Sequence, residues 1–401
     1  MRLFFLLANV TVVSLIYGVM NYPLILPGMR YLLMGSGALF LALQAVFRLV
    51  GRDDSFPYML NLKIAACFLG YLFIHYQFFP ANSTYGENKI VYLYFLFILG
   101  FVIVPILINS ERELVLLSQC LFIVAILFCL ISIFGQSTTE NVRRSELGLN
   151  PSFMGKICVI PAIYLGSQLL SAGTRIRIWH VLVLLISVMA ILKTGSRAVL
   201  IMFFISMVAM AVYVPISKFI FRTSLLVAVG LGGFVAAIQL HLLPEQIVER
   251  FKLENLLPSA HSDEGDRLDL FGLAINLIVE NPLGVGSGNF SSYHRFIVAP
   301  HNYLLESTTE FGWLMGLLVS SLFGWLFVSY RRISKNAGRG TQFFFLLYTN
   351  VILNAMVGGD MTHTSFLIYV SSGILVCVLQ KDKQSTDRSV LRVRKHYPSV
   401  L

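Results

Sequence analysis

Apolar runs alternate with shorter polar connections along almost the whole chain. Each run is close to 20 residues long, which is the length that an α-helix needs to cross a lipid bilayer. The pattern predicts twelve spans, near residues 3–20, 31–47, 58–79, 90–109, 114–135, 153–170, 178–192, 198–216, 225–242, 311–329, 343–357 and 364–379. The expected fold is an all-α polytopic membrane protein, with one transmembrane domain over residues 1–380, a large loop over 243–301 and a polar tail over 381–401.

Composition agrees with this pattern. Of the 401 residues, 57% are hydrophobic and 12% are charged, and the mean hydropathy is +0.77. Because a soluble domain carries about a quarter charged residues, most of this surface is expected to face lipid. The five cysteines lie in apolar runs without a CxxC pair, so they predict neither a disulfide framework nor a metal site. They are Cys67, Cys120, Cys129, Cys158 and Cys377.

Lysine and arginine residues indicate the orientation of the spans. If the connections alternate between two sides, one side carries more than half of the 30 Lys and Arg residues, mostly in short loops. By the positive-inside rule that side is cytoplasmic, with both termini, and the 243–301 loop lies on the periplasmic side. The net charge of +10 is then a topology signal, and no nucleic-acid partner is expected. The tail is expected to be disordered and to face anionic lipid.

Inside the long loop, residues 267–280 have the spacing of an amphipathic helix, which Pro282 ends. Its apolar residues fall at i, i+1, i+4, i+7 and i+8, and they are Leu270, Phe271, Ala274, Leu277 and Ile278. We expect this helix to lie at the membrane surface with that face toward the lipid. Arg267 stands at its start among acidic neighbours, where a surface arginine is unremarkable by itself.

Basic residues at the periplasmic ends of spans run against the positive-inside bias, so each needs a reason. Arg143 and Arg144 precede the sixth span, and Lys156 lies a turn into it. Each either snorkels to the interface or binds an anion, and snorkelling is the simpler interpretation for Lys156. Arg197 follows a Gly-Ser break and opens an apolar span, where an unpaired guanidinium costs about 2.5 kcal/mol or more. A pyrophosphate fits its bidentate donors, and an ion pair with Asp360 is the alternative.

His301 precedes the tenth span, in the sequence APHNYLLESTTEFG. A neutral imidazole, with a reference pKa of about 6.5, can take a proton from an attacking sugar hydroxyl. A helix cap or an interfacial position is the simpler alternative for a histidine at a helix start. Glu306 and Glu310 share one helix face at i, i+4, where they either orient the site or face a water-filled cavity.

The GVGSGNF sequence between the loop helix and His301 contains three alternate glycines. Such a turn can present backbone N–H groups to an anion. No strand–turn–helix unit surrounds it, so the sequence predicts neither a dinucleotide fold nor an ATP-binding P-loop. We interpret it as a flexible turn first and as a phosphate nest second.

Three segments stand out together: TGSRAVL at the start of a span, the loop helix followed by PLGVGSGNF, and HNYLLESTTEFG. This combination resembles the O-antigen ligase and polymerase family, which are bacterial inner-membrane glycosyltransferases of the GT-C type. The resemblance extends from about Arg143 to Asp360, and its most specific part is residues 267–312. It implies transfer of a glycan from an undecaprenyl-diphosphate carrier on the periplasmic face, with no metal or other cofactor.

Carried over position by position, the resemblance implies catalytic roles for Arg197, Arg267 and His301. It implies a substrate-binding set that comprises Arg143, Arg144, Asp360, Asn302, Glu306 and Glu310, and the sequence does not choose between Arg143 and Arg144 for the diphosphate. Ligases look closest, which implies inverting transfer of an O-polysaccharide to the lipid A–core oligosaccharide.

Three alternatives stay open at this stage. The first is a polymerase that acts on carrier-linked repeats, and the second is an enzyme that transfers the glycan to a protein hydroxyl. The third is a transporter, which is disfavoured because its polar residues would be distributed through mid-span positions. The sequence does not identify the sugars, the acceptor residue of the core or the oligomeric state.

Overall fold

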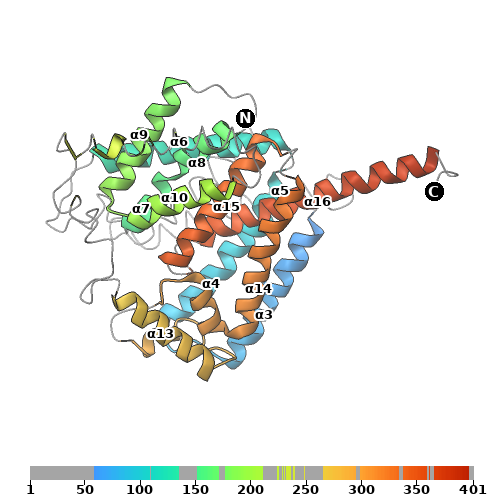
Figure 1. The fold of residues 1–401 in the computed structure, drawn as a ribbon. Helices are drawn as coiled ribbons and strands as arrows, with labels where there is room; N and C mark the ends of the chain where they lie inside the picture. The colour runs from blue at the N-terminus through green and yellow to red at the C-terminus, as the bar shows by residue number, and fades with distance from the viewer. Residues whose placement is uncertain are drawn as a thin grey trace, which may run out of the picture.

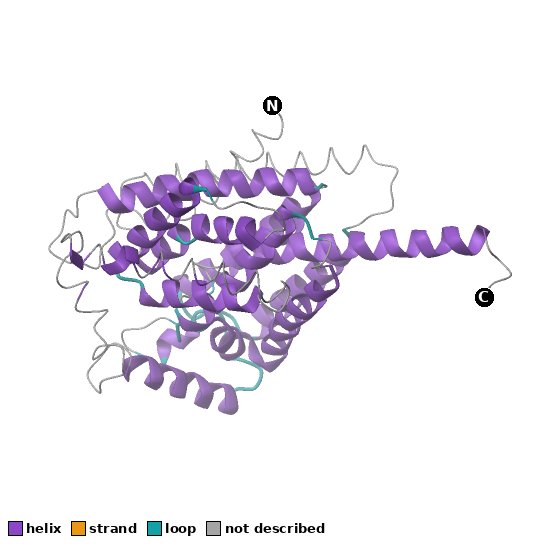
Figure 2. Ribbon diagram, turned by 45° about the horizontal axis from the view of Figure 1, so that its top comes forward, coloured by secondary structure: helices purple, strands orange, loops and turns teal. Residues whose placement is uncertain are grey.

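The computed structural model describes residues 58–108, 110–134, 151–170, 177–210, 265–294, 299–333, 337–358, 361 and 365–396, with isolated positions between 224 and 248. Every element in these residues is a helix (Figure 2). The predicted spans at residues 3–20 and 31–47, and most of that at 225–242, lie outside the described residues.

The helices are arranged as a bundle, from which the end of the last helix projects (Figure 1). In chain order they are α3 (Met59–Phe78), α4 (Thr84–Phe97), the π-helix η1 (Ile98–Ile103), α5 (Val104–Leu107), α6 (Glu111–Phe134), α7 (Pro151–Cys158), α8 (Ile160–Leu170), α9 (Ile178–Lys193), α10 (Arg197–Met210), α13 (Gly265–Glu280), the 3-10 helix η4 (Asn289–Ser292), α14 (Tyr303–Ile333), α15 (Arg339–Val357) and α16 (Ser365–His396).

Five segments of the described chain are long and apolar enough to cross a membrane. They are α3, the continuous run α4–η1–α5, α6, α14 and α15, while α9 and the apolar part of α10 are shorter. The prediction of an all-helical membrane protein is confirmed at this level. The predicted number of twelve spans stays a prediction.

A buried asparagine explains how the α4–η1–α5 run tolerates a proline. Pro105 has no N–H group, so the carbonyl of Phe101, four residues earlier, loses its helical donor. The Nδ2 of Asn61 donates to Phe101 O at 3.0 Å and to Gly373 O at 2.9 Å. One side-chain amide therefore joins α3, η1 and α16 inside the bundle.

Consecutive helices run between two ends of the bundle. At one end, Glu111 at the start of α6 accepts hydrogen bonds from the backbone N–H groups of Gly340 and Thr341 at the start of α15. At the same end, Lys381 late in α16 lies 6.0 Å from the ring centroid of Tyr58, which precedes α3. The positive-inside argument assigned these helix termini to the same side of the membrane, the cytoplasmic side.

The opposite end, which we call the site end, gathers the other termini. Lys193 at the end of α9 donates to Ile133 O near the end of α6, and Lys156 in α7 donates to Gly358 O after α15. Figure 1 shows α13 at this end, beside the lower ends of α3 and α4, while the tail of α16 projects away on the other side. The alternation predicted from the sequence holds for these helices.

Helix α13 corresponds to the predicted loop helix, but its apolar face does not lie against lipid. Three residues of that face are buried between α13, α14 and Phe290 of η4, namely Leu270, Ala274 and Leu277. The expectation that this face packs on the membrane surface was wrong for these residues, because α14 covers them. The apolar residues that stay exposed are Leu268, Ile275 and Val279.

The polar tail was also predicted incorrectly. Helix α16 continues to His396 without interruption (Figures 1 and 2). Its last 23 residues contain neither glycine nor proline, and they include Leu, Lys, Arg and Gln, which have high helix propensity. The first helix breaker is Pro398, so the local sequence favours a helical extension over disorder.

Candidate functional site

His301 lies in a strained turn directly before α14. It is the one non-glycine residue with a positive φ, at 55°, in the part of the chain that the structure describes. Asn302, and not His301, caps the helix, because its Oδ1 accepts from the N–H groups of Leu304 and Leu305 at 3.0 Å each. A left-handed residue that is neither glycine nor a cap is often found at a functional position.

The helix that follows His301 is interrupted after about two and a half turns. Gly312 has φ 80° and ψ 175°, which are non-helical values, so the carbonyls of Thr309 and Glu310 lose their helical donors. The backbone N–H groups of Val285 and Gly286 donate to those two carbonyls, at 2.9 Å each. The glycine-rich turn therefore completes a short half-helix, residues 303–311, that begins beside His301.

The glycine-rich turn is tightly packed, and the N–H groups of Gly284, Val285 and Gly286 are occupied. Gly284, Gly286 and Gly288 have φ values of 93°, 95° and 69°. The N–H of Gly284 donates to Asn281 O at 2.9 Å, and the next two N–H groups bind the half-helix. A Cβ at Gly284 would lie 2.6 Å from the carbonyl oxygen of Glu310. The turn is thus a structural clamp, so the expectation of a flexible turn was wrong, and three N–H groups that a phosphate nest would use already bind protein carbonyls.

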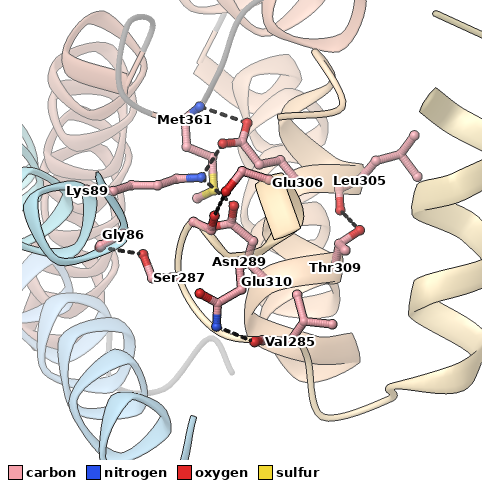
Figure 3. Close-up of polar contacts among 12 residues, drawn as sticks. Gly86, Lys89, Val285, Ser287, Asn289, Leu305, Glu306, Thr309, Glu310 and Met361 are labelled. Atoms are coloured by element: carbon pink, nitrogen blue, oxygen red, sulfur yellow. Dashed lines mark hydrogen bonds and ion pairs between the residues drawn. The ribbon is translucent and has the colours of Figure 1, made fainter. Parts of the chain in front are cut away.

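Helix α3 and the loop after it hold the same clamp from another side. Tyr71 donates its hydroxyl to Phe311 O at 2.6 Å, and His75 Nε2 donates to Leu283 O at 2.8 Å. The Asn289 side chain binds Val285 O and also the loop between α3 and α4 (Figure 3). The half-helix is therefore fixed at its broken end as well as at its cap.

A buried cluster of three charges holds the middle of the half-helix. Lys89 of α4 places its Nζ between Glu306 and Glu310, 2.7 Å from the Oε1 of Glu310 and in contact with the Oε1 of Glu306 (Figure 3). All three side chains are 0% exposed. The second oxygen of Glu306, Oε2, accepts from the Met361 N–H at 2.9 Å. The two carboxylates share a face as predicted, but they contact protein there and not a water-filled cavity.

The last turn of α15 and the residue after it contact the cap of the half-helix and α7. Asn302 Nδ2 donates to Met356 O at 2.8 Å, and Lys156 Nζ donates to Gly358 O at 2.5 Å. Lys156 is 8% exposed, so the snorkelling interpretation is wrong, since its amino group turns into the protein. Asp360, which follows in the sequence, lies outside the described residues.

Arg197 lies on a turn that packs against α7. It opens α10 directly after Ser196 and is half-buried. Gly155 of α7 approaches that turn so closely that a Cβ would lie 3.1 Å from Ser196 Cβ and 3.2 Å from Thr194 Oγ1. The next residue of α7, Lys156, binds Gly358 O just after α15. The last turn of α15 in turn binds Asn302, which caps α14. A series of contacts therefore runs from the Arg197 turn through α7 and α15 to the start of α14.

Comparison with known families identifies this part of the chain. Residues 182–320 match the family model of the O-antigen ligases. This part of the chain is similar to the O-antigen ligase family. The match includes the Arg197 turn, α13, the glycine-rich turn and the half-helix after His301. A search of curated proteins finds no match.

The matched stretch contains five predicted site residues whose side chains the structure describes: Arg197, His301, Asn302, Glu306 and Glu310. Arg267 is placed in the first turn of α13 by its backbone. Arg143 and Arg144, like Asp360, lie outside the described residues. Substrate contact by Asn302, Glu306 and Glu310 stays a prediction, and in the structure their side chains bind protein atoms.

Lys89 lies outside the matched residues of the O-antigen ligase family, and the sequence argument did not select it. It was assigned to the loop between the third and fourth predicted spans. A signal was present, since Lys89 is a basic residue at a periplasmic span end in that assignment, as Arg197 is. Its partners are 217 and 221 residues away in sequence, which no local motif connects.

The matched stretch offers an imidazole on the strained turn before α14 and a guanidinium on the turn before α10. These groups can act as a general base and as a ligand for phosphate oxygens. Within the described residues, no group of three or more His, Cys, Asp or Glu side chains is placed to hold a metal ion. The chemistry that these residues themselves supply is proton transfer and binding of negative charge.

Proposed function

We propose that this protein is an O-antigen ligase, which transfers an O-polysaccharide from undecaprenyl diphosphate to the lipid A–core oligosaccharide. The observation that carries the proposal is His301, held in a left-handed turn at the start of a clamped half-helix. This turn lies inside the stretch that matches the O-antigen ligase family. Arg197 lies in the same stretch, at the start of α10.

His301 is the general base of the proposed reaction. Its imidazole takes the proton from a hydroxyl group of the acceptor sugar, whose oxygen attacks the anomeric carbon of the donor. A new glycosidic C–O bond forms while the bond between that carbon and the diphosphate oxygen breaks, and the electron pair leaves with the diphosphate. Attack from the face opposite the leaving group inverts the anomeric configuration.

Arginines receive the charge that the leaving group gains. A guanidinium forms bidentate bonds to phosphate oxygens, and preorganised donors of this kind stabilise developing charge effectively. We assign this role to Arg197 and Arg267, with Arg143 or Arg144 as a further ligand, and we place Asp360 in the substrate-binding part of the site. A diphosphate neutralised by arginines leaves without help from a metal ion or ATP.

The proposed location is the bacterial inner membrane, with both termini cytoplasmic and the site on the periplasmic face. Two observations support it. Basic residues accumulate in the connections on one predicted side, and the described helices alternate between two ends of the bundle. Both lipid substrates would then reach the site end from the outer leaflet of that membrane.

The test is the lipopolysaccharide made by a deletion strain that expresses His301→Ala. We expect no capped lipopolysaccharide and long glycan chains that remain on the carrier lipid, with the protein present in the membrane at normal levels. His294→Ala, a histidine in the same loop region outside the proposed site, is the matched control and should restore capping. A normal polymer ladder on the core in the His301→Ala strain would disprove the assignment.

The same deletion strain separates the alternatives. Loss of a polymerase leaves the core capped with a single repeat, whereas loss of a ligase leaves long chains on the carrier. A protein glycosyltransferase would instead leave an unglycosylated target protein and intact lipopolysaccharide. The lipid that accumulates therefore identifies which of the three reactions the chain performs.

A further inference from the structure

The proposed reaction does not use the buried cluster of Lys89, Glu306 and Glu310. All three side chains are fully buried, and Lys89 comes from α4, outside the stretch that matches the O-antigen ligase family. Burial of charges in a membrane-spanning segment is costly, and apolar residues of similar volume often stabilise a protein equally well. Stability alone therefore gives no reason for three charges at this place.

The cluster connects the half-helix to the chain segment after α15. Glu306 uses one carboxylate oxygen for Lys89 and the other for the Met361 N–H, at 2.9 Å. One turn earlier on the same half-helix, Asn302 binds Met356 O at 2.8 Å. The first turns of α14 are thus attached at two points to the stretch between residues 356 and 361. His301 directly precedes the first of these attachments.

We propose that Glu306, oriented by Lys89, is a positioning residue that holds the His301 turn in register with residues 356–361. This inference rests on the proposed function for its kinetic part, since it assigns to Glu306 an effect on the rate of glycan transfer. Donor binding should depend on it little, because Glu306 is enclosed by protein and the arginines are elsewhere. Glu310 has a different role, which is to balance the charge of Lys89.

The difference between a carboxylate and an amide makes the proposal testable. A carboxylate accepts at both oxygens, whereas a glutamine side chain accepts at one end and donates at the other. In Glu306→Gln the –NH₂ group must face either the Lys89 ammonium or the Met361 N–H, both of which are donors. Glu310→Gln can keep its carbonyl oxygen toward Lys89. Because the bond to the Lys89 ammonium is charge-assisted and therefore the stronger one, the amide oxygen in Glu306→Gln is expected to stay with Lys89. The two substitutions thus remove the same charge, but only the first breaks the link to residue 361.

The experiment uses the full-length protein in nanodiscs and three single variants. These are Glu306→Gln, Glu310→Gln and the control Glu280→Gln, an exposed residue at the end of α13. With an undecaprenyl-diphosphate-linked glycan and lipid A–core as substrates, we expect kcat of Glu306→Gln to fall about 10-fold or more, since small misplacements of a reacting group have such effects. Its KM for the donor should change by less than about twofold. The kcat of Glu310→Gln should fall less than that of Glu306→Gln, and Glu280→Gln should stay within about threefold of the unmodified protein.

Hydrogen exchange provides a readout that does not depend on activity. Peptides that cover residues 356–361 should exchange faster in Glu306→Gln, and should be unchanged in Glu310→Gln and Glu280→Gln. Equal losses of kcat in Glu306→Gln and Glu310→Gln, or unchanged exchange in Glu306→Gln, would overturn the proposal. If exchange responds as expected while the unmodified protein transfers no glycan, the positioning role stands and the proposed function fails.

A triple variant covers the case in which Glu306→Gln does not fold. Lys89→Met, Glu306→Gln and Glu310→Gln together leave no charge in the cluster, and the Lys89 ammonium no longer competes for the amide oxygen at position 306. Its amide oxygen is then free to accept from the Met361 N–H. We expect exchange of residues 356–361 to be as slow as in the unmodified protein. A folded triple variant with fast exchange at these residues would contradict the proposal.

Discussion

The two parts of α14 on either side of Gly312 are held by different forces. Before Gly312, the half-helix is fixed by a cap, by a buried ion cluster and by backbone bonds from the glycine-rich turn. After Gly312, the helix is mostly apolar, and several of its large side chains are exposed to the surroundings of the bundle. They include Trp313, Leu314, Leu317 and Val328.

This difference allows the two parts of α14 to have different roles. One part holds the helix in the membrane, and the other fixes the position of the His301 turn. Apolar side chains against lipid gain little from association with other helices, because lipid tails are as apolar as leucine. Hydrogen bonds and ion pairs, in contrast, are directional and fix distances to a few tenths of an ångström. The half-helix next to His301 is therefore the precisely located part of α14, and the remainder serves as its membrane anchor.

The largest effect is expected when the ion cluster of the half-helix is broken. Lys89→Met leaves two buried carboxylates without their cation, which should lower the free energy of unfolding by about 3–5 kcal/mol. The thermal unfolding midpoint of the purified protein measures this loss. Lys63→Met, at an exposed position of α3, is the control and should change stability by less than about 0.5 kcal/mol. Equal midpoints for the two variants would mean that the cluster does not anchor the half-helix.

A smaller effect is expected from the glycine clamp. In Gly284→Ala the new Cβ would have to occupy a φ of 93° and lie 2.6 Å from Glu310 O. Backbone strain of this kind costs about 1–3 kcal/mol, which the same unfolding assay detects. Gly272→Ala, in α13 where a Cβ meets nothing within 4 Å, should instead be neutral or slightly stabilising. A Gly284→Ala protein as stable as Gly272→Ala would show that the turn is not a clamp.

Hydropathy predicted the anchor but not the half-helix. The tenth span was placed at residues 311–329, whereas α14 begins at Tyr303. The stretch before Gly312 contains two glutamates and three threonine or serine residues, which lower its hydropathy below that of a span. A hydropathy scale counts residue types, and it does not register that a lysine from another helix neutralises those glutamates.

Local sequence motifs identified the candidate reactive residues but not the contacts that hold them in place. His301 and Arg197 were recognised because each breaks the apolar pattern within a few residues of a span end. Lys89 breaks the pattern in the same way, yet its structural role depends on partners more than 200 residues away in the sequence. The glycine-rich turn shows the same limit, since its sequence is compatible with a nest, and only the contacts with Thr309 and Glu310 show that its donors are used.

The smallest effect is expected on the lipid-facing side of the anchor. Leu317 is 63% exposed, so Leu317→Ala exchanges one lipid contact for another and should change the unfolding midpoint little, within about 0.5 kcal/mol. Met315, two residues earlier, is 0% exposed, and Met315→Ala should cost about 2–5 kcal/mol because it leaves a cavity. The pair tests whether the second part of α14 is anchored through one face only. Equal losses in the two variants would place Leu317 against protein, in an assembly of more than one chain, and would remove the contrast between the two parts of the helix.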